Sequence, residues 1–296
     1  MLNGIIYLNK PKGISSSDAF YPLKKLLKKN GYKNTKIGHY GTLDPFATGL
    51  LLVAIGPCTR LADFVHEESI KTYLAKGIFG SKTSTGDYTG EKLRDFPLPE
   101  VLNTDLLTTK FQGEYWQIPP AVSAAKHQGK ALYEWVREGV IIQKAPVRRF
   151  IHELNVLSIT REQIKFEASV STGTYIRTLM EDIAAHLGSG GHLQELSRIR
   201  IGEVSINEAL REIPSTIEEL KNCLHSPTKV LPYAEIQLTT SQCEFFRNGR
   251  EIVMPEVSSG RYWAKGHEGE LLGLAEFRDG SLRVLVNMMQ QGVKNS

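Results

Sequence analysis

The sequence has few cysteines, no long apolar run and no pattern of metal ligands, and each absence excludes a class of protein. Its three cysteines are odd in number and far apart, so they form neither a disulfide framework nor a zinc site. Such usage is typical of a reducing cytoplasm, where we expect this protein. No apolar run approaches the ~20 residues that span a bilayer, and no leader peptide is evident. Neither a P-loop nor a dinucleotide fingerprint occurs. We therefore expect no membrane association, no metal and no cofactor.

Acidic residues are scarce at the N-terminus, although the composition is otherwise that of a globular protein. The chain has 296 residues, of which 41% are hydrophobic and 23% charged, enough for one large domain or a large and a small one. The net charge is only +4, yet Asp18 is the sole acid among residues 1–36. This stretch is either a phosphate-binding surface or an ordinary solvated helix face. Its lysines are Lys10, Lys12, Lys24, Lys25, Lys28, Lys29, Lys33 and Lys36.

Alternating and helical patterns follow one another along the first 205 residues, which predicts mixed α and β structure. A strand at residues 4–8 leads into a helix that ends at Asn30-Gly31, with Ser16, Ser17 or Asp18 as its N-cap. The further predicted elements are a strand at 71–79, a polar loop at 81–90, a hairpin of strands 151–159 and 164–170, and a helix at 174–187.

The composition changes near Pro227 and Pro232, where we place a domain boundary, giving domains 1–230 and 231–296. Beyond it, short alternating runs are separated by turn pairs such as Asn248-Gly249 and Asp279-Gly280. Closely spaced strand and turn signals of this kind predict a small β-barrel or sandwich. Its role is open at this point between binding a ligand and stabilising the first domain.

The most constrained stretch presents Asp44 on a stiff loop. Pro45 pushes Asp44 toward extended geometry, and Gly38, Gly41 and Gly49 permit tight turns or close approach by another segment. The apolar residues 50–55 that follow are a buried strand or the start of a helix. An isolated Asp-Pro pair is most often a simple turn. The neighbouring glycines, with His39 and Thr42, favour a functional carboxylate, because a turn requires none of them.

The segment Gly38 to Leu51, GHYGTLDPFATGLL, resembles the active-site motif of the TruB-type tRNA pseudouridine synthases. The resemblance implies an α+β catalytic domain, with a mixed and largely antiparallel sheet flanked by helices, and a PUA-like, RNA-binding C-terminal β-barrel. It implies cofactor-free isomerisation of uridine to pseudouridine at position 55 in the T loop of tRNA. Four other segments agree in order and spacing: Asn9 to Ser16, Lys71 to Tyr73, Pro119 to Gly139 and Ser171 to Gly202.

Pseudouridine formation breaks the bond between N1 and C1′ and joins C5 to C1′, so the base has to leave its stack and enter a pocket. A carboxylate is needed to attack the sugar or remove a proton from it, and Asp44 is the candidate. Arg177 lies in the first turn of its predicted helix and can pair with Asp44 in a cleft, although spacing alone favours a surface pair with Glu181. Tyr73 can stack on the flipped base and assist proton transfer, although a lone strand tyrosine is usually packing.

The resemblance also points to residues that contact the RNA, and two positions depart from the family pattern. Val122 stands where an aromatic residue is common, and Ser197 where a second arginine often precedes Arg198. Arg148, Arg149 and Arg200 are scattered basic positions that could contact phosphates. The expected substrate-binding residues are His39, Lys10, Lys12, Thr42, Asp87, Lys126, Tyr175 and Arg198.

Two other functions remain open from the sequence. One is the catalytic subunit of a guide-RNA-dependent synthase, which shares the loop around Asp44. The compact segment 119–139 and the lack of long extensions favour a stand-alone enzyme, so we expect tRNA as the partner, bound through its T arm, and no guide RNA. The other is a non-catalytic RNA chaperone, which the joint presence of Asp44, Tyr73 and Arg177 disfavours.

Overall fold

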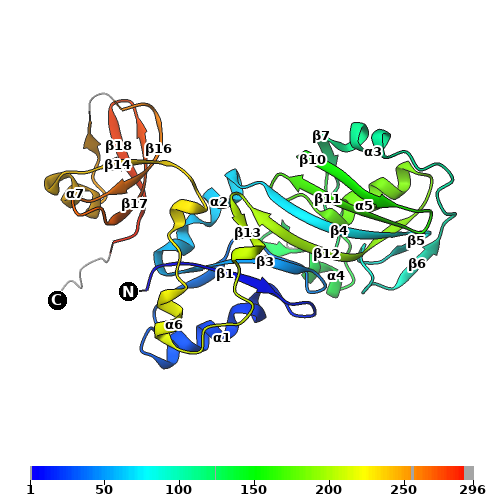
Figure 1. Cartoon of the computed structure of the whole chain (residues 1–296), viewed down its shortest axis with the longest axis horizontal. Helices are drawn as coiled ribbons and strands as arrows, with labels where there is room; N and C mark the ends of the chain where they lie inside the picture. Colours follow the sequence, from blue (N-terminus) through cyan, green and yellow to red (C-terminus); the bar gives the residue numbers. More distant parts are fainter. Residues whose placement is uncertain (1, 124, 255–256, 290–296) are drawn as a thin grey trace.

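A nine-stranded mixed sheet forms the centre of the larger part of the protein (Figure 1). The computed structural model describes residues 2–123, 125–254 and 257–289. The strand order is β1-β3-β12-β4-β11-β10-β7, and only the β3–β12 pair is parallel, which confirms the expected largely antiparallel sheet. The strands are β1 (Gly4–Lys10), β2 (Ile37–His39), β3 (Thr48–Ile55), β4 (Lys71–Phe79), β7 (Gly113–Gln117), β10 (Val147–Ile159), β11 (Gln163–Val170), β12 (Gly191–Ile201) and β13 (Val204–Ser205).

Helices and two short hairpins surround this sheet. Within the described residues, no helix is long and apolar enough to cross a membrane. The prediction of a polar loop at 81–90 is wrong at its start, because residues 81–83 form a strand that pairs with the strand at residues 92–95. The helices are α1 (Ser16–Lys29), α2 (Ala62–Glu68), α3 (Thr104–Phe111), α4 (Leu132–Arg137), α5 (Ile176–His186) and α6 (Ile217–Asn222), and the hairpins are β5 (Ser81–Thr83) with β6 (Lys92–Asp95) and β8 (Lys126–His127) with β9 (Lys130–Ala131).

The N-cap of helix α1 is Ser15, one residue before the first expected cap, because Ser15 and Asp18 form a capping box. Its buried face carries Phe20, Leu23 and Leu27, as the spacing predicts. The lysines of its other face are exposed.

The apolar residues 50–55 form the inner part of strand β3, which is buried on both faces. Alternate side chains belong to two different clusters: Leu50 and Leu52 pack in one, Leu51 and Val53 in the other. A strand covered on both sides reads as a continuous apolar run, which is why its sequence did not distinguish it from a helix.

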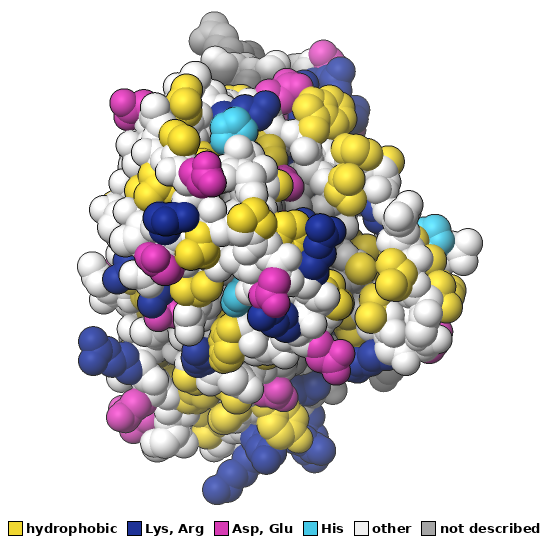
Figure 2. Space-filling view, turned by 90° about the vertical axis from the view of Figure 1, so that its right-hand side faces the viewer, with side chains coloured by type: hydrophobic (Ala, Val, Ile, Leu, Met, Phe, Trp, Pro, Cys, Tyr) yellow, Lys and Arg dark blue, Asp and Glu magenta, His cyan; other side chains and the backbone are white. Residues whose placement is uncertain are grey.

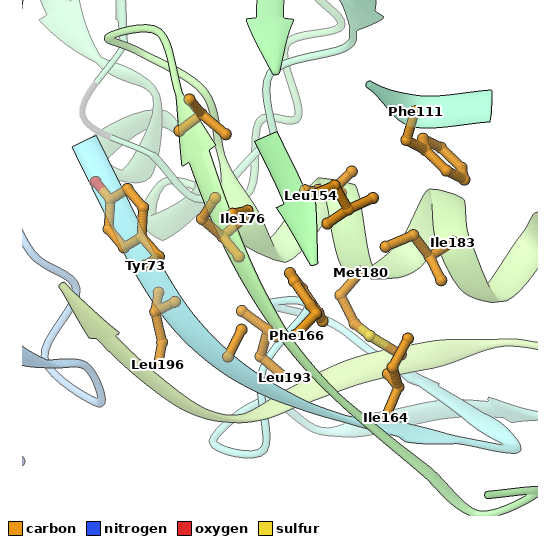
Figure 3. Close-up of a cluster of buried hydrophobic side chains, with 14 of the residues drawn as sticks. Tyr73, Phe111, Leu154, Ile164, Phe166, Ile176, Met180, Ile183, Leu193 and Leu196 are labelled. Atoms are coloured by element: carbon orange, nitrogen blue, oxygen red, sulfur yellow. The ribbon is translucent and has the colours of Figure 1, made fainter. Parts of the chain in front are cut away.

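Helix α5 covers the other half of the sheet and packs on the inward side chains of β4 and β11 (Figure 3). Met180 reaches the backbone of Gly77, where a Cβ atom would lie 1.9 Å from its sulfur. The alternation of β4 places Tyr73 on this same face, beside Ile176 at the start of the helix. The helix therefore brings its own first turn next to the strand that carries Tyr73.

The C-terminal part is a curled five-stranded sheet in the order β14-β16-β17-β18-β15, consistent with a PUA-like domain (Figure 1). It also contains a helix that the sequence did not predict, capped by Thr239 with Gln242. The turn expected at Asn248-Gly249 therefore ends a helix, not a strand. The elements are β14 (Ala234–Gln237), α7 (Thr240–Arg247), β15 (Ile252–Val253), β16 (Gly260–Lys265), β17 (Leu271–Arg278) and β18 (Ser281–Asn287).

The two parts share a hydrophobic core. Trp263 of the C-terminal sheet is fully buried in a cluster with Tyr7 and Leu52 of the central sheet, and its Nε1 donates to the Leu231 carbonyl at 2.7 Å. Arg261 adds ion pairs to two glutamates of α2. Cutting the chain at residue 231 would therefore expose apolar surface on both sides.

Candidate active site

A cavity of about 380 Å³ lies where the Asp44 loop, strand β4, the segment before α5 and strand β12 meet. It brings together residues that are more than 130 positions apart in the sequence, since Asp44 and Arg177 both line it. Its lining consists of Gly41, Thr42, Leu43, Asp44, His66, Lys71, Tyr73, Ala125, Arg149, Ser171, Thr172, Gly173, Thr174, Tyr175, Ile176, Arg177, Leu196 and Arg198.

The loop that carries Asp44 is fixed at both ends. Gly41 and Gly49 have φ values of 96° and 110°, which favour glycine. A Cβ atom at Gly49 would also lie 2.3 Å from the Arg198 carbonyl oxygen, so the close approach of β12 requires glycine there. Between them, the Ser16 hydroxyl donates to the Leu43 carbonyl at 3.0 Å and accepts from the Leu43 amide at 2.8 Å. The loop therefore holds its carboxylate in one place.

Arg177 binds that carboxylate with two hydrogen bonds. Its Nε donates to Oδ2 of Asp44 at 2.9 Å and its Nη2 to Oδ1 at 3.3 Å. The pairing with Asp44, not with Glu181, is thus confirmed among the described residues. Nη1 donates to the Thr85 carbonyl at 2.6 Å and Nη2 to the Val122 carbonyl at 2.9 Å. Only 4% of the Arg177 side chain is exposed, so this buried guanidinium joins three separate segments.

Because Val122 takes part through its backbone carbonyl, a valine side chain in place of the family's usual aromatic residue leaves this contact intact.

Two tyrosines line the same cavity. Tyr73 is 8% exposed, and Figure 3 shows its hydroxyl at the end of the ring that points away from the apolar side chains of the core. Tyr175 is half-buried, and Gln117 fixes its backbone by accepting from its amide at 2.7 Å and donating to its carbonyl at 2.9 Å. The rings of Tyr73 and Tyr175 and the hydroxyl of Tyr73 therefore border the space next to Asp44.

The assignment of Lys10 and Arg198 as RNA contacts does not fit the structure, because both are buried and bonded to carbonyl oxygens. Lys10 donates to the carbonyls of Pro11, Ile14 and Pro45. Arg198 is 1% exposed and donates to the carbonyls of Leu50 (2.8 Å) and Gly41 (3.0 Å). Both cations hold the Asp44 loop from within, and almost none of either side chain is exposed to a phosphate.

Asp87 and His39 are also placed differently from expectation, outside the described lining of the cavity. The buried carboxylate of Asp87 accepts from the amide (2.9 Å) and the hydroxyl (2.5 Å) of Thr89, so it stabilises a turn within its own loop. The half-buried ring of His39 lies 5.9 Å from that of Phe20. Neither residue is therefore part of the described lining around Asp44.

The side chains of the three remaining candidates are exposed. Thr42 lines the cavity. The ammonium of Lys12 lies 4.3 Å from the centre of the Tyr88 ring. Lys126 starts the hairpin β8–β9, and its carbonyl accepts from Lys144 at 2.9 Å. These side chains stay available to a ligand that approaches from outside.

Comparison with known proteins shows which family has this sequence. Residues 28–176 match the family model described as TruB family pseudouridylate synthase (N terminal domain). The chain belongs to this family. The tRNA pseudouridine synthase B of Cupriavidus metallidurans is 35% identical, over 95% of this chain and 93% of its own length. That of Thermosipho melanesiensis is 36% identical, over 86% of this chain and 82% of its own.

Solved structures confirm the fold of this TruB-family chain. A chain of the Cbf5-Nop10-Gar1 complex superposes with a TM-score of 0.68 at 22% identity, covering 97% of this chain and 85% of its own. A chain of the archaeal box H/ACA sRNP Nop10-Cbf5 complex gives a TM-score of 0.67 at 20% identity, covering 98% and 87%.

Sequence reasoning assigned no role to two residues that line the cavity of this pseudouridylate synthase, Lys71 and His66, and named Arg149 only among scattered basic positions. Lys71 is 5% exposed, and its Nζ donates to the Thr172 hydroxyl at 3.1 Å. Burial, and after it the nearby Arg198, lowers the pKa of Lys71 to about 7. Burial likewise lowers the pKa of His66. A signal existed for Lys71, because strand alternation places it on the same face as Tyr73.

Within the described residues, no group of three or more His, Cys, Asp or Glu side chains is placed to hold a metal ion.

Proposed function

We propose that this protein isomerises uridine to pseudouridine in tRNA, at position 55 of the T loop, without cofactor or guide RNA. The family membership supports the reaction. The relatives named tRNA pseudouridine synthase B, which align with most of the chain, support tRNA as the substrate.

The observation that carries this proposal is the two-point contact between Asp44 and the buried Arg177 in a cavity that also exposes Tyr73. The guanidinium holds the carboxylate in one orientation beside the cavity through two charge-assisted hydrogen bonds. Asp44 attacks C1′ of the sugar or removes a proton from the sugar, and the N1–C1′ bond breaks. After the base turns, C5 bonds to C1′ while the bond from Asp44 to C1′ breaks or, in the second route, the sugar regains the proton that Asp44 removed. The proton on C5 then leaves and N1 gains one. The sum is an isomerisation that consumes nothing.

Tyr73 has two roles in this proposal. Its ring stacks on the extruded uracil, which offsets part of the few kcal/mol that base flipping costs. Its hydroxyl, at the open end of the ring, assists departure of the C5 proton. Tyr175 and Thr42 border the same space and contact the flipped nucleotide.

The tRNA is held outside the cavity by the lysine face of α1, by Lys12 and Lys126, and by the C-terminal sheet. In this proposal residues 1–230 perform the chemistry, while residues 231–296 add RNA contacts. The buried Trp263 makes deletion of the second part uninformative, because the shared core would be exposed. Alanine at two exposed cations of the intact C-terminal part, Arg250 between α7 and β15 and Arg278 at the end of β17, is the cleaner test: binding should weaken and become less sensitive to salt.

The decisive experiment is tritium release from C5-labelled uridine in an unmodified tRNA transcript, without guide RNA or metal. Release from the normal transcript, and none when cytidine replaces the uridine at position 55, supports the proposal. Release only after a guide RNA is added would identify a guide-dependent synthase. RNA binding without release from any uridine would identify an RNA chaperone.

A further inference from the structure

The cavity contains more positive charge than its single carboxylate can balance. Asp44 is the one acid in its described lining, and Arg177 already pairs with it. Lys71, Arg149 and Arg198 also line the cavity, and none of them has a carboxylate at ion-pair distance among the described residues. Buried or half-buried cations are stable only when paired or hydrogen-bonded. The carbonyls of Gly41 and Leu50 satisfy Arg198, which leaves Lys71 and Arg149.

These two cations converge on one short loop. Lys71 donates to the hydroxyl of Thr172, and that hydroxyl itself donates to the Ser69 carbonyl at 3.2 Å. The guanidinium of Arg149 lies over the next residue, because a Cβ atom built on Gly173 would be 2.9 Å from its Nη2. Gly173 has φ 80° and is exposed, so the loop leaves its backbone open between the two cations. Strands β4 and β10 thus place a lysine and an arginine on either side of residues 172–173.

The charge distribution elsewhere differs from this concentration. On the end of the molecule that Figure 2 shows, basic and acidic side chains are interspersed with apolar ones. The exposed arginine next in sequence, Arg148, pairs with Glu114 at 3.4 Å. Unlike Arg148, Lys71 and Arg149 line the cavity and have no acidic partner among the described residues.

We propose that Lys71, Arg149 and Thr172 form a phosphate subsite of the cavity, which holds the phosphate on one side of the flipped uridine. The inference rests on the proposed function, since it takes an RNA strand as the ligand. The monoanionic phosphodiester balances unpaired positive charge, whereas a uracil carbonyl is neutral and would not. A bound phosphate would also favour the protonated form of Lys71, whose pKa burial lowers to about 7.

The test pairs a neutral phosphate with a neutral side chain. Two RNA stem-loops carry a methylphosphonate, one at the phosphate on the 5′ side of the target uridine and one at the phosphate on its 3′ side. Each is compared with a stem-loop that has the ordinary phosphate at that linkage. The nucleotide on the 5′ side of the linkage is a deoxynucleotide in the modified and in the unmodified RNA. Binding is measured at pH 6.5, where Lys71 carries its proton, for the parent protein and for Lys71→Met. The matched control is Lys76→Met, because Lys76 lies on the same strand but outside the described lining of the cavity.

We expect Lys71→Met to weaken binding of the ordinary RNA about tenfold, the effect of one charge-assisted hydrogen bond. At one of the two linkages the methylphosphonate should weaken the parent about tenfold and leave Lys71→Met almost unchanged. Lys76→Met should respond to it like the parent. If both methylphosphonates weaken Lys71→Met as much as the parent, Lys71 holds no phosphate and the subsite is wrong. Uridine isomerisation by the parent is a separate measurement, so this failure would leave the proposed function standing.

Discussion

Replacing Arg177 by lysine tests the central geometry of the proposed site. The guanidinium makes two hydrogen bonds to Asp44 and one each to the carbonyls of Thr85 and Val122. A lysine keeps the charge but cannot reproduce a planar, two-point contact. We therefore expect Arg177→Lys to fold, to bind tRNA nearly as well as the parent, and to turn over slowly.

The size of the effect follows from the burial of the pair. Removing one partner of a buried ion pair costs about 3–5 kcal/mol of stability. Since the lysine retains the charge and Asp44 is 35% exposed on its open side, we expect a loss of about 2 kcal/mol. A displacement of the carboxylate by about 1 Å is enough to lower the rate about 100-fold. That factor corresponds to about 2.7 kcal/mol of activation free energy.

The rate is measured as single-turnover tritium release at saturating enzyme, and the stability by urea unfolding. Arg148→Lys is the control, because Arg148 is an exposed arginine whose partner Glu114 is 3.4 Å away. Its rate should stay within about twofold of the parent, and its free energy of unfolding within about 0.5 kcal/mol. A rate within tenfold of the parent for a folded Arg177→Lys protein would show that orientation of Asp44 by Arg177 does not limit the reaction.

Three further predictions concern Asp44, Tyr73 and Lys71. Asp44→Asn should abolish tritium release and leave tRNA affinity nearly unchanged; activity within tenfold of the parent, only about 1.4 kcal/mol of barrier, would remove Asp44 from the chemistry. Tyr73→Leu should lose more activity than Tyr73→Phe, which keeps the stacking ring, and equal small losses would make Tyr73 a packing residue. Lys71 has a pKa of about 7 in the folded protein and 10.5 when unfolded, so the unfolded chain binds more protons above pH 7 and stability should rise with pH there. Between pH 7 and 8 the parent should gain more stability than Lys71→Met, by up to about 1.4 kcal/mol, and identical pH slopes in urea unfolding would mean that the lysine is not desolvated.

Local patterns were enough for much of the fold and for the chemistry at its centre. Alternation predicted β4 and the hairpin of β10 and β11, and the apolar stripe predicted α5 to within two residues at each end. These elements are determined by periodicities that act over a few residues. Strand β12 was not predicted, because two register shifts interrupt its alternation. Helix α7 was missed because it is short and mostly polar, with Cys243 and Phe246 as its buried residues and Thr239 as its cap.

By itself, then, the sequence determined that Asp44 sits on a rigid loop, since proline and glycine restrict or free the backbone wherever they stand. Only the tertiary structure decided what each cation does. Lys10 bonds to a carbonyl 35 residues away and Arg198 to one 148 residues away, so both serve the loop from inside. Lys71 is a basic residue like them, and its side chain lines the cavity. The local sequence around a charged residue does not show its neighbours in the fold, because segments distant in the chain supply the acids, carbonyls or open space around it.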